Sequence, residues 1–319
     1  MLKLRLAVTH TMTLDGPMGY LSCNDVAPLL SSPLMSTAAI FHVSTIPTLL
    51  LVAHRAYTWL VPILYRQMNL QYDRQLQGFL GVAQTCPALL QHVREIVLPT
   101  GYPPETTAKV FDGLRSCHKL GGLAMLHSHL IHEVVANGLA LPPRLSTHLE
   151  GLFQQDTAEH GAPPQIQVGT HHLETLLAFR FVTHLDWFDD LTAYKSDDDE
   201  EHARQFIIQL PALTHLAVVP FSAENYVDNL AARLPRLRVL VIVWSLSGYL
   251  RRRSDDPVLR IAFRDSRVVC SVYDEWYEGM TSGYRSTFWD LAEELVRGKA
   301  NSTVPENEFW ARPPERHSR

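Results

Sequence analysis

The chain has 319 residues, of which 46% are hydrophobic and 19% charged, and 28 basic against 33 acidic side chains give a net charge of −5. A chain of this length can bury a core without a disulfide or metal staple, and its apolar content excludes disorder throughout. The negative charge argues against a general nucleic-acid binder, which needs a basic face. The cysteines are far apart and form no Cys-x-x-Cys pair, which favours free thiols of an intracellular protein.

The longest apolar stretch runs from Thr37 to Tyr65 and is interrupted by His42, His54 and Arg55. A membrane-spanning helix needs about 20 predominantly apolar residues, so this stretch is not predicted to cross a membrane. The opening MLKLRLAV has too short an apolar run for a signal peptide. We therefore expect a cytoplasmic or nuclear protein, or one that is present in both compartments.

The N-terminal quarter is predicted to be helical. Apolar residues recur at spacings of three and four between Leu49 and Leu64, which is typical of a helix that packs one face on a core. Pro62 lacks an amide donor and should bend or end this helix. A second helix is expected from Asp73 to Ala83. The residues predicted to face the core are Leu50, Ala53, Tyr57, Leu60 and Leu64 in the first helix and Leu76, Phe79 and Leu80 in the second.

From about Val93, short apolar runs follow leucine-rich phrases. The phrase Leu-Pro-x-Leu begins at positions 210 and 234, which are 24 residues apart, and Thr-His-Leu begins at 183 and 214, which are 31 apart. These spacings lie near the roughly 20 to 29 residues of leucine-rich repeats, in which a strand and a helix or loop stack on the next unit. The predicted strands fall within His92–Leu98, Cys117–Leu126, Gln165–Val168, Phe181–Trp187, Leu210–Val219, Leu234–Val243 and Arg267–Tyr273.

The segments between and after these strands are predicted from their charge and periodicity. Ala223–Leu234 should be a helix, and the acidic block Asp197–Glu201 a solvated loop. Thr287 should cap a helix that runs to Val296, with Asp290 near its start and Gly298 as its stop. This helix is expected to cover the last strand through Phe288, Leu291, Ala292 and Leu295.

Few residues carry a catalytic signature. His129 and His132 are spaced so that a helix would bring them together, as in a metal site, although Glu133 follows them instead of standing between them as in zinc proteases. The chain has no Gly-x-Ser-x-Gly elbow, phosphate-binding loop or dinucleotide fingerprint. We expect no cofactor and no enzymatic activity, and a metal-dependent hydrolase at His129 and His132 stays as the alternative from a different class.

Three tryptophans lie at or just after predicted strand ends. Aromatic side chains are favoured anchors of protein interfaces, and repeat proteins present strand residues on one surface. Trp187, Trp244 and Trp276 are therefore candidate contacts for a protein partner. The alternative is that these rings fill the core.

The segment Leu49–Arg66 resembles the second half of the F-box-like segment of a large fungal family, with Trp59, Pro62, Leu64, Tyr65 and Arg66 on the matching positions. In that family an irregular leucine-rich-repeat-like region follows. The repeated Leu-Pro-x-Leu-Thr-His-Leu phrases and the ending from Asp265 to Trp289 are also similar to that family. The resemblance covers most of the chain from Leu49 to Val296.

The resemblance, together with the spacing of the leucine phrases, implies an α/β architecture with an F-box-like helical unit in residues 1–90 and a leucine-rich-repeat-like stack in 91–300. The tail in 301–319 is expected to be disordered because of Pro305, Pro313 and Pro314. The resemblance implies a substrate adaptor whose F-box helices dock on the linker subunit of a cullin ubiquitin ligase while the repeats select a target protein. The contacts expected on the first helix are Leu50, Tyr57, Trp59, Pro62, Leu64 and Tyr65. The usual Leu-Pro-x-Glu-Leu/Ile opening does not precede Leu49, so a plain repeat scaffold, with this helix as a packing cap, stays open.

Overall fold

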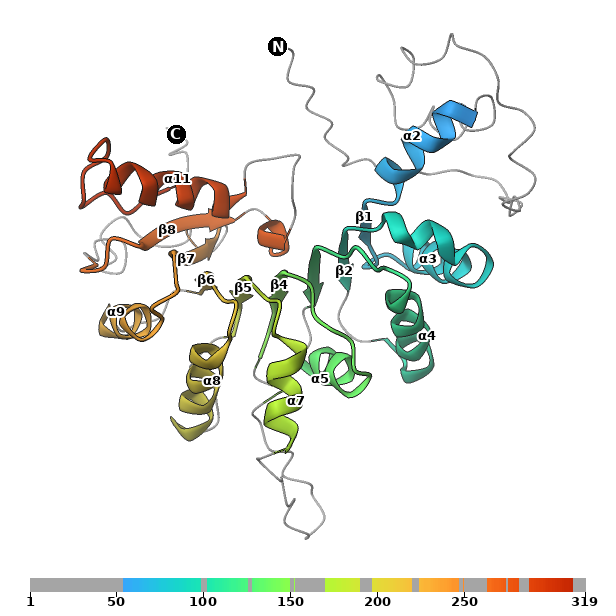
Figure 1. Ribbon diagram of the computed structural model, residues 1–319, viewed down its shortest axis with the longest axis horizontal. Helices are drawn as coiled ribbons and strands as arrows, with labels where there is room; N and C mark the ends of the chain where they lie inside the picture. Colours follow the sequence, from blue (N-terminus) through green and yellow to red (C-terminus); the bar gives the residue numbers. More distant parts are fainter. Residues whose placement is uncertain are drawn as a thin grey trace. The chain divides into compact units, whose positions relative to one another are not determined.

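The computed structural model describes residues 54–98, 102–125, 128–149, 152, 170–189, 197–219, 224–246, 249, 263–273, 275–280 and 287–311. They form an α/β fold in which helices alternate with the strands of an eight-stranded, all-parallel sheet, and these strands follow one another in chain order from β1 to β8 (Figure 1). This confirms the α/β part of the predicted architecture. None of the helices in these ranges is long and apolar enough to cross a membrane.

The chain divides into two compact units, Met1–Ile96 with Pro103–Leu120 and Val97–Tyr102 with Gly121–Arg319. The first unit therefore extends beyond residue 90, where the sequence placed the end of the helical part. It holds α2 (His54–Leu64), β1 (Gln67–Asn69), α3 (Asp73–Thr85), the 3-10 helix η5 (Pro87–His92), the beginning of β2 (Glu95–Leu98) and α4 (Pro104–Arg115).

Helix α3 forms the centre of the first unit, since it packs on α4, η5 and β1. The prediction for this helix is confirmed, because Leu76, Phe79 and Leu80 are its buried residues. Gly113 of α4 faces the Phe79 ring so closely that a Cβ atom would lie 2.6 Å from Cε1 of that ring. The two helices can approach this closely only because position 113 has no side chain.

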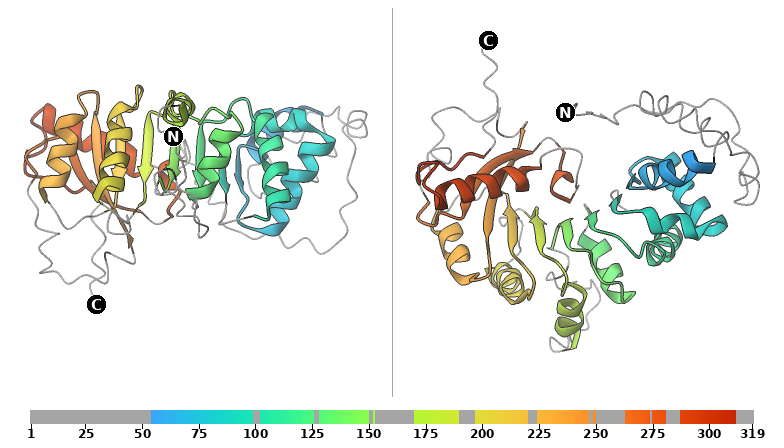
Figure 2. Two further views of the ribbon diagram at one scale, coloured as in Figure 1. Left: turned by 90° about the horizontal axis from the view of Figure 1, so that it is seen from below. Right: turned by 45° about the horizontal axis from the view of Figure 1, so that its top comes forward.

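The second unit repeats a strand and a helix along the chain. Strands β3 to β8 pair in parallel with their neighbours. The α8 and α9 helices lie side by side on one face of the sheet, and α11 lies on the opposite face (Figures 1 and 2). The elements of this unit are β3 (Gly122–Met125), α5 (Ser128–Ala136), β4 (Arg144–Thr147), α7 (Thr170–Ala178), β5 (His184–Trp187), α8 (Asp197–Gln209), β6 (His215–Val218), α9 (Glu224–Arg233), β7 (Val239–Ser245), β8 (Val268–Tyr273), η8 (Glu278–Met280) and α11 (Phe288–Ala300).

The segments predicted to hold strands contain β2, β3, β5, β6 and β8 and most of β7, which continues past Val243 to Ser245, and α9 lies where a helix was expected. Leu185, Leu216 and Leu240 stand in register on three neighbouring strands and are fully buried. Strand β4 was not predicted from the sequence, because the Pro142-Pro143 pair directly before it is typical of a turn. The strand expected at Gln165–Val168 lies outside the described residues.

The acidic block Asp197–Glu201 is not a loop, because α8 begins at Asp197. Carboxylates near a helix N-terminus are stabilised by the helix dipole, so the charge run favours the start of a helix here. Glu201 also accepts hydrogen bonds from Arg204 and Gln205 of the same helix. The loop was predicted from the mutual repulsion of these charges alone, without their attraction to the N-terminus of a helix.

Helix α11 has the predicted N-terminus but a different end and a partly different buried face. Thr287 caps it in a reciprocal arrangement with Asp290. Gly298 does not stop the helix, which continues to Ala300. A Cβ atom at Gly298 would lie 2.7 Å from Cγ2 of Val304, so the glycine allows the following chain to fold back closely.

The chain after Asn301 is ordered up to Ala311, so the prediction of a disordered tail is wrong for this part. Trp310 forms a parallel bridge with Cys270 of β8, and its ring lies 5.3 Å from the ring of Trp244. The remaining tail residues lie outside the described part of the chain. The expectation of free thiols holds for Cys117 and Cys270, which are buried, and fails for Cys86, which is disulfide-bonded.

Candidate functional site

The repeated Thr-His pairs of β5 and β6 occupy equivalent places in the sheet. His184 and His215 are register partners, and the backbone amides of Thr214 and His215 both donate to the carbonyl of Thr183. In the preceding repeat, the amides of Thr183 and His184 donate in the same way to the carbonyl of Pro143. The sequence repeat at a distance of 31 residues is therefore also a structural repeat, and it stacks one histidine on the other.

The two imidazole rings are parallel, with 4.0 Å between their centroids and an interplanar angle of 1°. Nδ1 of His184 lies 2.9 Å from the Thr183 hydroxyl, and Nδ1 of His215 lies 2.8 Å from the Thr214 hydroxyl. Each threonine thus fixes the orientation of the ring that follows it. Nε2 of both rings consequently lies on the side away from the threonines.

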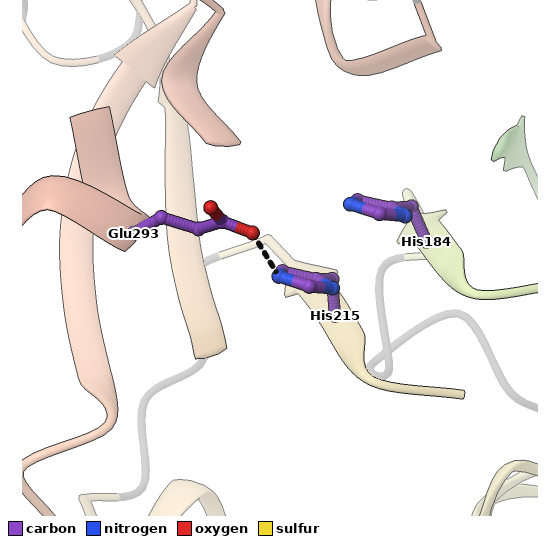
Figure 3. Close-up of side chains that lie close together, drawn as sticks. All are labelled: His184, His215 and Glu293. Carbon is purple, nitrogen blue, oxygen red and sulfur yellow. Dashed lines mark hydrogen bonds and ion pairs between the residues drawn. The ribbon is translucent and has the colours of Figure 1, made fainter. Parts of the chain in front are cut away.

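Helix α11 closes this side of the sheet. Trp289 packs its ring almost perpendicularly against both histidines, at centroid distances of 5.5 and 5.6 Å. One turn further along, the Oε1 atom of Glu293 lies 2.8 Å from Nε2 of His215 (Figure 3). A helix far along the chain therefore completes a polar group that begins on two neighbouring strands.

His184, His215 and Glu293 form what we call the His–His–Glu cluster. One ligand atom from each side chain lies within 4.8 Å of the others. His215 is buried, with an exposed fraction of 2%, whereas the Glu293 side chain is 30% exposed and His184 is half-buried. The cluster therefore has one buried member and two members that solvent can reach.

Burial controls the charge of the two histidines. It lowers the pKa of His184 to about 3, with smaller contributions from the charges of His215 and Arg144. Burial also lowers the pKa of His215, although the Glu293 carboxylate opposes this shift. Both imidazoles are therefore neutral at pH 7, and a neutral imidazole can serve as a metal ligand.

A buried pair of polar side chains, Ser146 and Asp186, lies beside the His–His–Glu cluster. Ser146 of β4 donates a hydrogen bond to Asp186 of β5, and burial raises the pKa of Asp186 to about 7. Gly279 of η8 lies so close to this carboxyl that a Cβ atom there would collide with it. The pair is enclosed by protein, so its arrangement fits a role in holding η8 against β4 and β5.

The contacts predicted on the first helix are partly exposed. Trp59 of α2 has an exposed fraction of 62%, and Pro62, Leu64 and Tyr65 are half-buried. Leu60 is buried, as its place in the apolar stripe predicted. Leu50 lies outside the described residues, as does the side chain of Tyr57.

The three tryptophans of the strand ends do not share an open surface. Trp187 and Trp244 are buried on the same face as the leucines of their strands, because residues two apart in a strand point the same way. Trp187 also donates its indole proton to Asp189. These two rings offer no surface to a partner, whereas Trp276 is half-buried and packs against the cores formed around α11 and around Met280.

The histidines singled out from the sequence are not those that the structure brings together. His129 and His132 lie on α5, and their side chains are outside the described part of the chain. Sequence reasoning identified the Thr-His-Leu repeat as a repeat but not as a site. Because the repeat has the same position in two neighbouring predicted strands, it could have predicted that His184 and His215 lie side by side. Nothing in the sequence pointed to Glu293.

Comparisons of the chain with protein-family models, with curated proteins and with solved structures find no match.

Proposed function

We propose that the protein is a non-enzymatic recognition module that docks on a partner subunit through α2. The resemblance of Leu49–Arg66 to an F-box-like segment favours the linker subunit of a cullin ubiquitin ligase as this partner. In that case the protein is a substrate adaptor, and the repeating strand–helix region carries the surface that selects a target protein.

The exposure of two large apolar side chains on α2 carries this proposal. Trp59 and Ile63 are 62% and 52% exposed, while Leu60 and Val61 between them are buried. Residues four apart lie on the same side of a helix, so Trp59 and Ile63 form one apolar stripe opposite the buried side. Helices that enter a partner's groove use anchors with this spacing.

The same observation weighs against a pure packing cap. A cap would need the tryptophan of the helix buried against its own protein, since burial of apolar area is what would hold the cap in place. Most of the surface of Trp59 is instead exposed to solvent. The stripe therefore supports docking over the plain scaffold.

The test is a binding measurement with the purified linker subunit of a cullin ligase. The double variant Trp59→Ala/Ile63→Ala should lose binding while its thermal melting stays unchanged, because both side chains are exposed. Tyr72→Ala is the matched control, since Tyr72 is 60% exposed in the same unit but lies outside α2. Absence of binding by the wild-type protein, or equal binding by the double variant, would reject docking through α2.

A further inference from the structure

We infer that the His–His–Glu cluster is a zinc site that fastens α11 to β5 and β6. The inference is independent of docking through α2. Two imidazoles and one carboxylate are a known set of protein ligands for Zn²⁺, and the fourth position is then left for water, as in open zinc sites and unlike structural sites that four protein ligands close. The solvent-accessible carboxylate of Glu293 provides the side from which the ion and this water enter.

The surroundings of the two histidines fit the protonation state that a metal requires. A ring that binds metal through Nε2 carries its proton on Nδ1 and needs an acceptor there. The Thr183 hydroxyl is 3.1 Å from the carbonyl oxygen of Pro143. The Thr214 hydroxyl is 3.2 Å from that of Thr183. Each hydroxyl can therefore donate to a carbonyl while it accepts the Nδ1 proton of a metal-bound ring. In the metal-free protein Nε2 of His215 instead donates its proton to the Glu293 carboxylate, and this proton leaves when the metal binds.

The ligand atoms need only a small approach, whereas the two parallel imidazole rings must also turn before both Nε2 lone pairs point at one ion. Zinc bonds of about 2.0 to 2.1 Å in a tetrahedral site place ligand atoms roughly 3.3 Å from one another. The cluster has 2.8 Å between His215 and Glu293 and at most 4.8 Å between any two ligand atoms. The largest approach needed is therefore about 1.5 Å. Glu293 and His184 are the members that move, because both are partly exposed, and the His184 ring gives up its parallel stack on His215 when it turns toward the ion.

Neighbouring positive charges oppose the binding of a cation: Arg144 and Arg238 act on both histidines, and Arg297 lies 3.8 Å from the Glu293 carboxylate. Arg144 is the register partner of His184 on β4, on the side away from His215. Its guanidinium repels a dication in the cluster and lowers the affinity. The structure thus predicts a site of moderate affinity that becomes stronger when this charge is removed.

The experiment is zinc titration of the full-length protein by calorimetry after treatment with a chelator, together with thermal melting. We expect one equivalent of Zn²⁺ to bind and to raise the melting temperature. His184→Gln and Glu293→Gln should each weaken binding by more than the roughly 10- to 100-fold that the loss of an outer-shell partner costs, since each removes a ligand itself. Arg144→Gln should strengthen it. No binding by the wild-type protein, or undiminished binding by His184→Gln, would overturn the inference.

Two control variants separate this site from other histidines. His202→Gln changes an exposed histidine on α8 and should leave zinc binding unchanged. His129→Gln/His132→Gln changes the pair that the sequence suggested, and it should also bind zinc normally. Loss of zinc in this double variant, with native melting in chelator, would place the metal on α5 and overturn the inference. His184→Gln should keep its native circular-dichroism spectrum, because that side chain is half-buried and the contact of Glu293 with His215 stays in place.

Discussion

Nε2 of His215 lies 2.8 Å from Oε1 of Glu293, and this contact joins β6 to α11. The two residues are separated by 78 positions, so the contact depends on the packing of α11 over the sheet. It gives a polar atom of a residue with an exposed fraction of only 2% its hydrogen-bond partner.

Glu293→Ala should therefore destabilise the metal-free protein. The variant leaves a buried polar atom without its partner, which costs about 1 to 3 kcal/mol. The measurement is urea unfolding in the presence of a chelator. Glu294→Ala is the control, because the neighbouring glutamate is exposed and its loss should change the unfolding free energy by less than about 0.5 kcal/mol. Equal effects of the two substitutions would contradict a structural role for the contact.

The buried strands were predictable from the sequence because their signal is local. The apolar runs at His215–Val218 and Val239–Ser245 follow nearly identical leucine phrases, and each phrase ends in a strand of the sheet. A parallel strand covered on both faces is apolar along its length, so the run itself identifies it. Strand β4 lacks this signal, since Ser146 and Thr147 make up half of it.

The His–His–Glu cluster was only partly predictable, because one member depends on long-range packing. The repeat of Thr-His-Leu placed His184 and His215 in equivalent positions. Glu293 joins them only through the rotation of α11, which is set by Trp289. The apolar spacing favoured Leu291 and Leu295 as buried residues, whereas both are half-buried and Trp289 is fully buried.

Leu240→Asp should unfold the second unit. Leu240 is fully buried in β7 between its register partners Leu216 and Val268, so the variant places a carboxyl group where no water or partner can reach it. We expect the unfolding free energy to fall by about 4 kcal/mol or more, so that the cooperative thermal transition seen by circular dichroism is lost. Arg238→Asp, at an exposed position just before β7, should melt nearly as the wild type. Unchanged melting of Leu240→Asp would remove the buried-strand assignment.

Two helical glycines of the first unit should respond in opposite directions to alanine. Gly113→Ala forces a methyl group against the Phe79 ring and should destabilise the protein by about 1 to 3 kcal/mol. A Cβ atom at Gly78 of α3 meets nothing within 4 Å, so Gly78→Ala should stabilise by up to about 1 kcal/mol through helix propensity. Chemical denaturation of both variants checks the sign. A stabilising Gly113→Ala would show that α3 and α4 do not pack at this distance.

The last prediction concerns acid stability and the loop before β8. Arg267 donates to the Asp265 carboxylate and to the backbone carbonyls of Ala231, Leu234 and Leu237, so it ties this loop to the end of α9 and the turn that follows. The hydrogen bond from Arg267 lowers the pKa of Asp265 below its usual value of 3.8.

Because the folded state then binds fewer protons than the unfolded state, stability from this pair is present above about pH 4 and is lost as the pH falls through the folded pKa. Asp265→Asn should reduce the unfolding free energy at pH 7 by about 1 to 2 kcal/mol through loss of the charged hydrogen bonds. It should also lose less stability than the wild type between pH 5 and pH 3. Urea unfolding at pH 7, 5 and 3 measures both effects, with Glu294→Gln as the control for removal of a negative charge. If the unfolding free energy of Asp265→Asn fell between pH 5 and pH 3 as steeply as that of the wild type, Asp265 would not contribute to the loss of stability in acid.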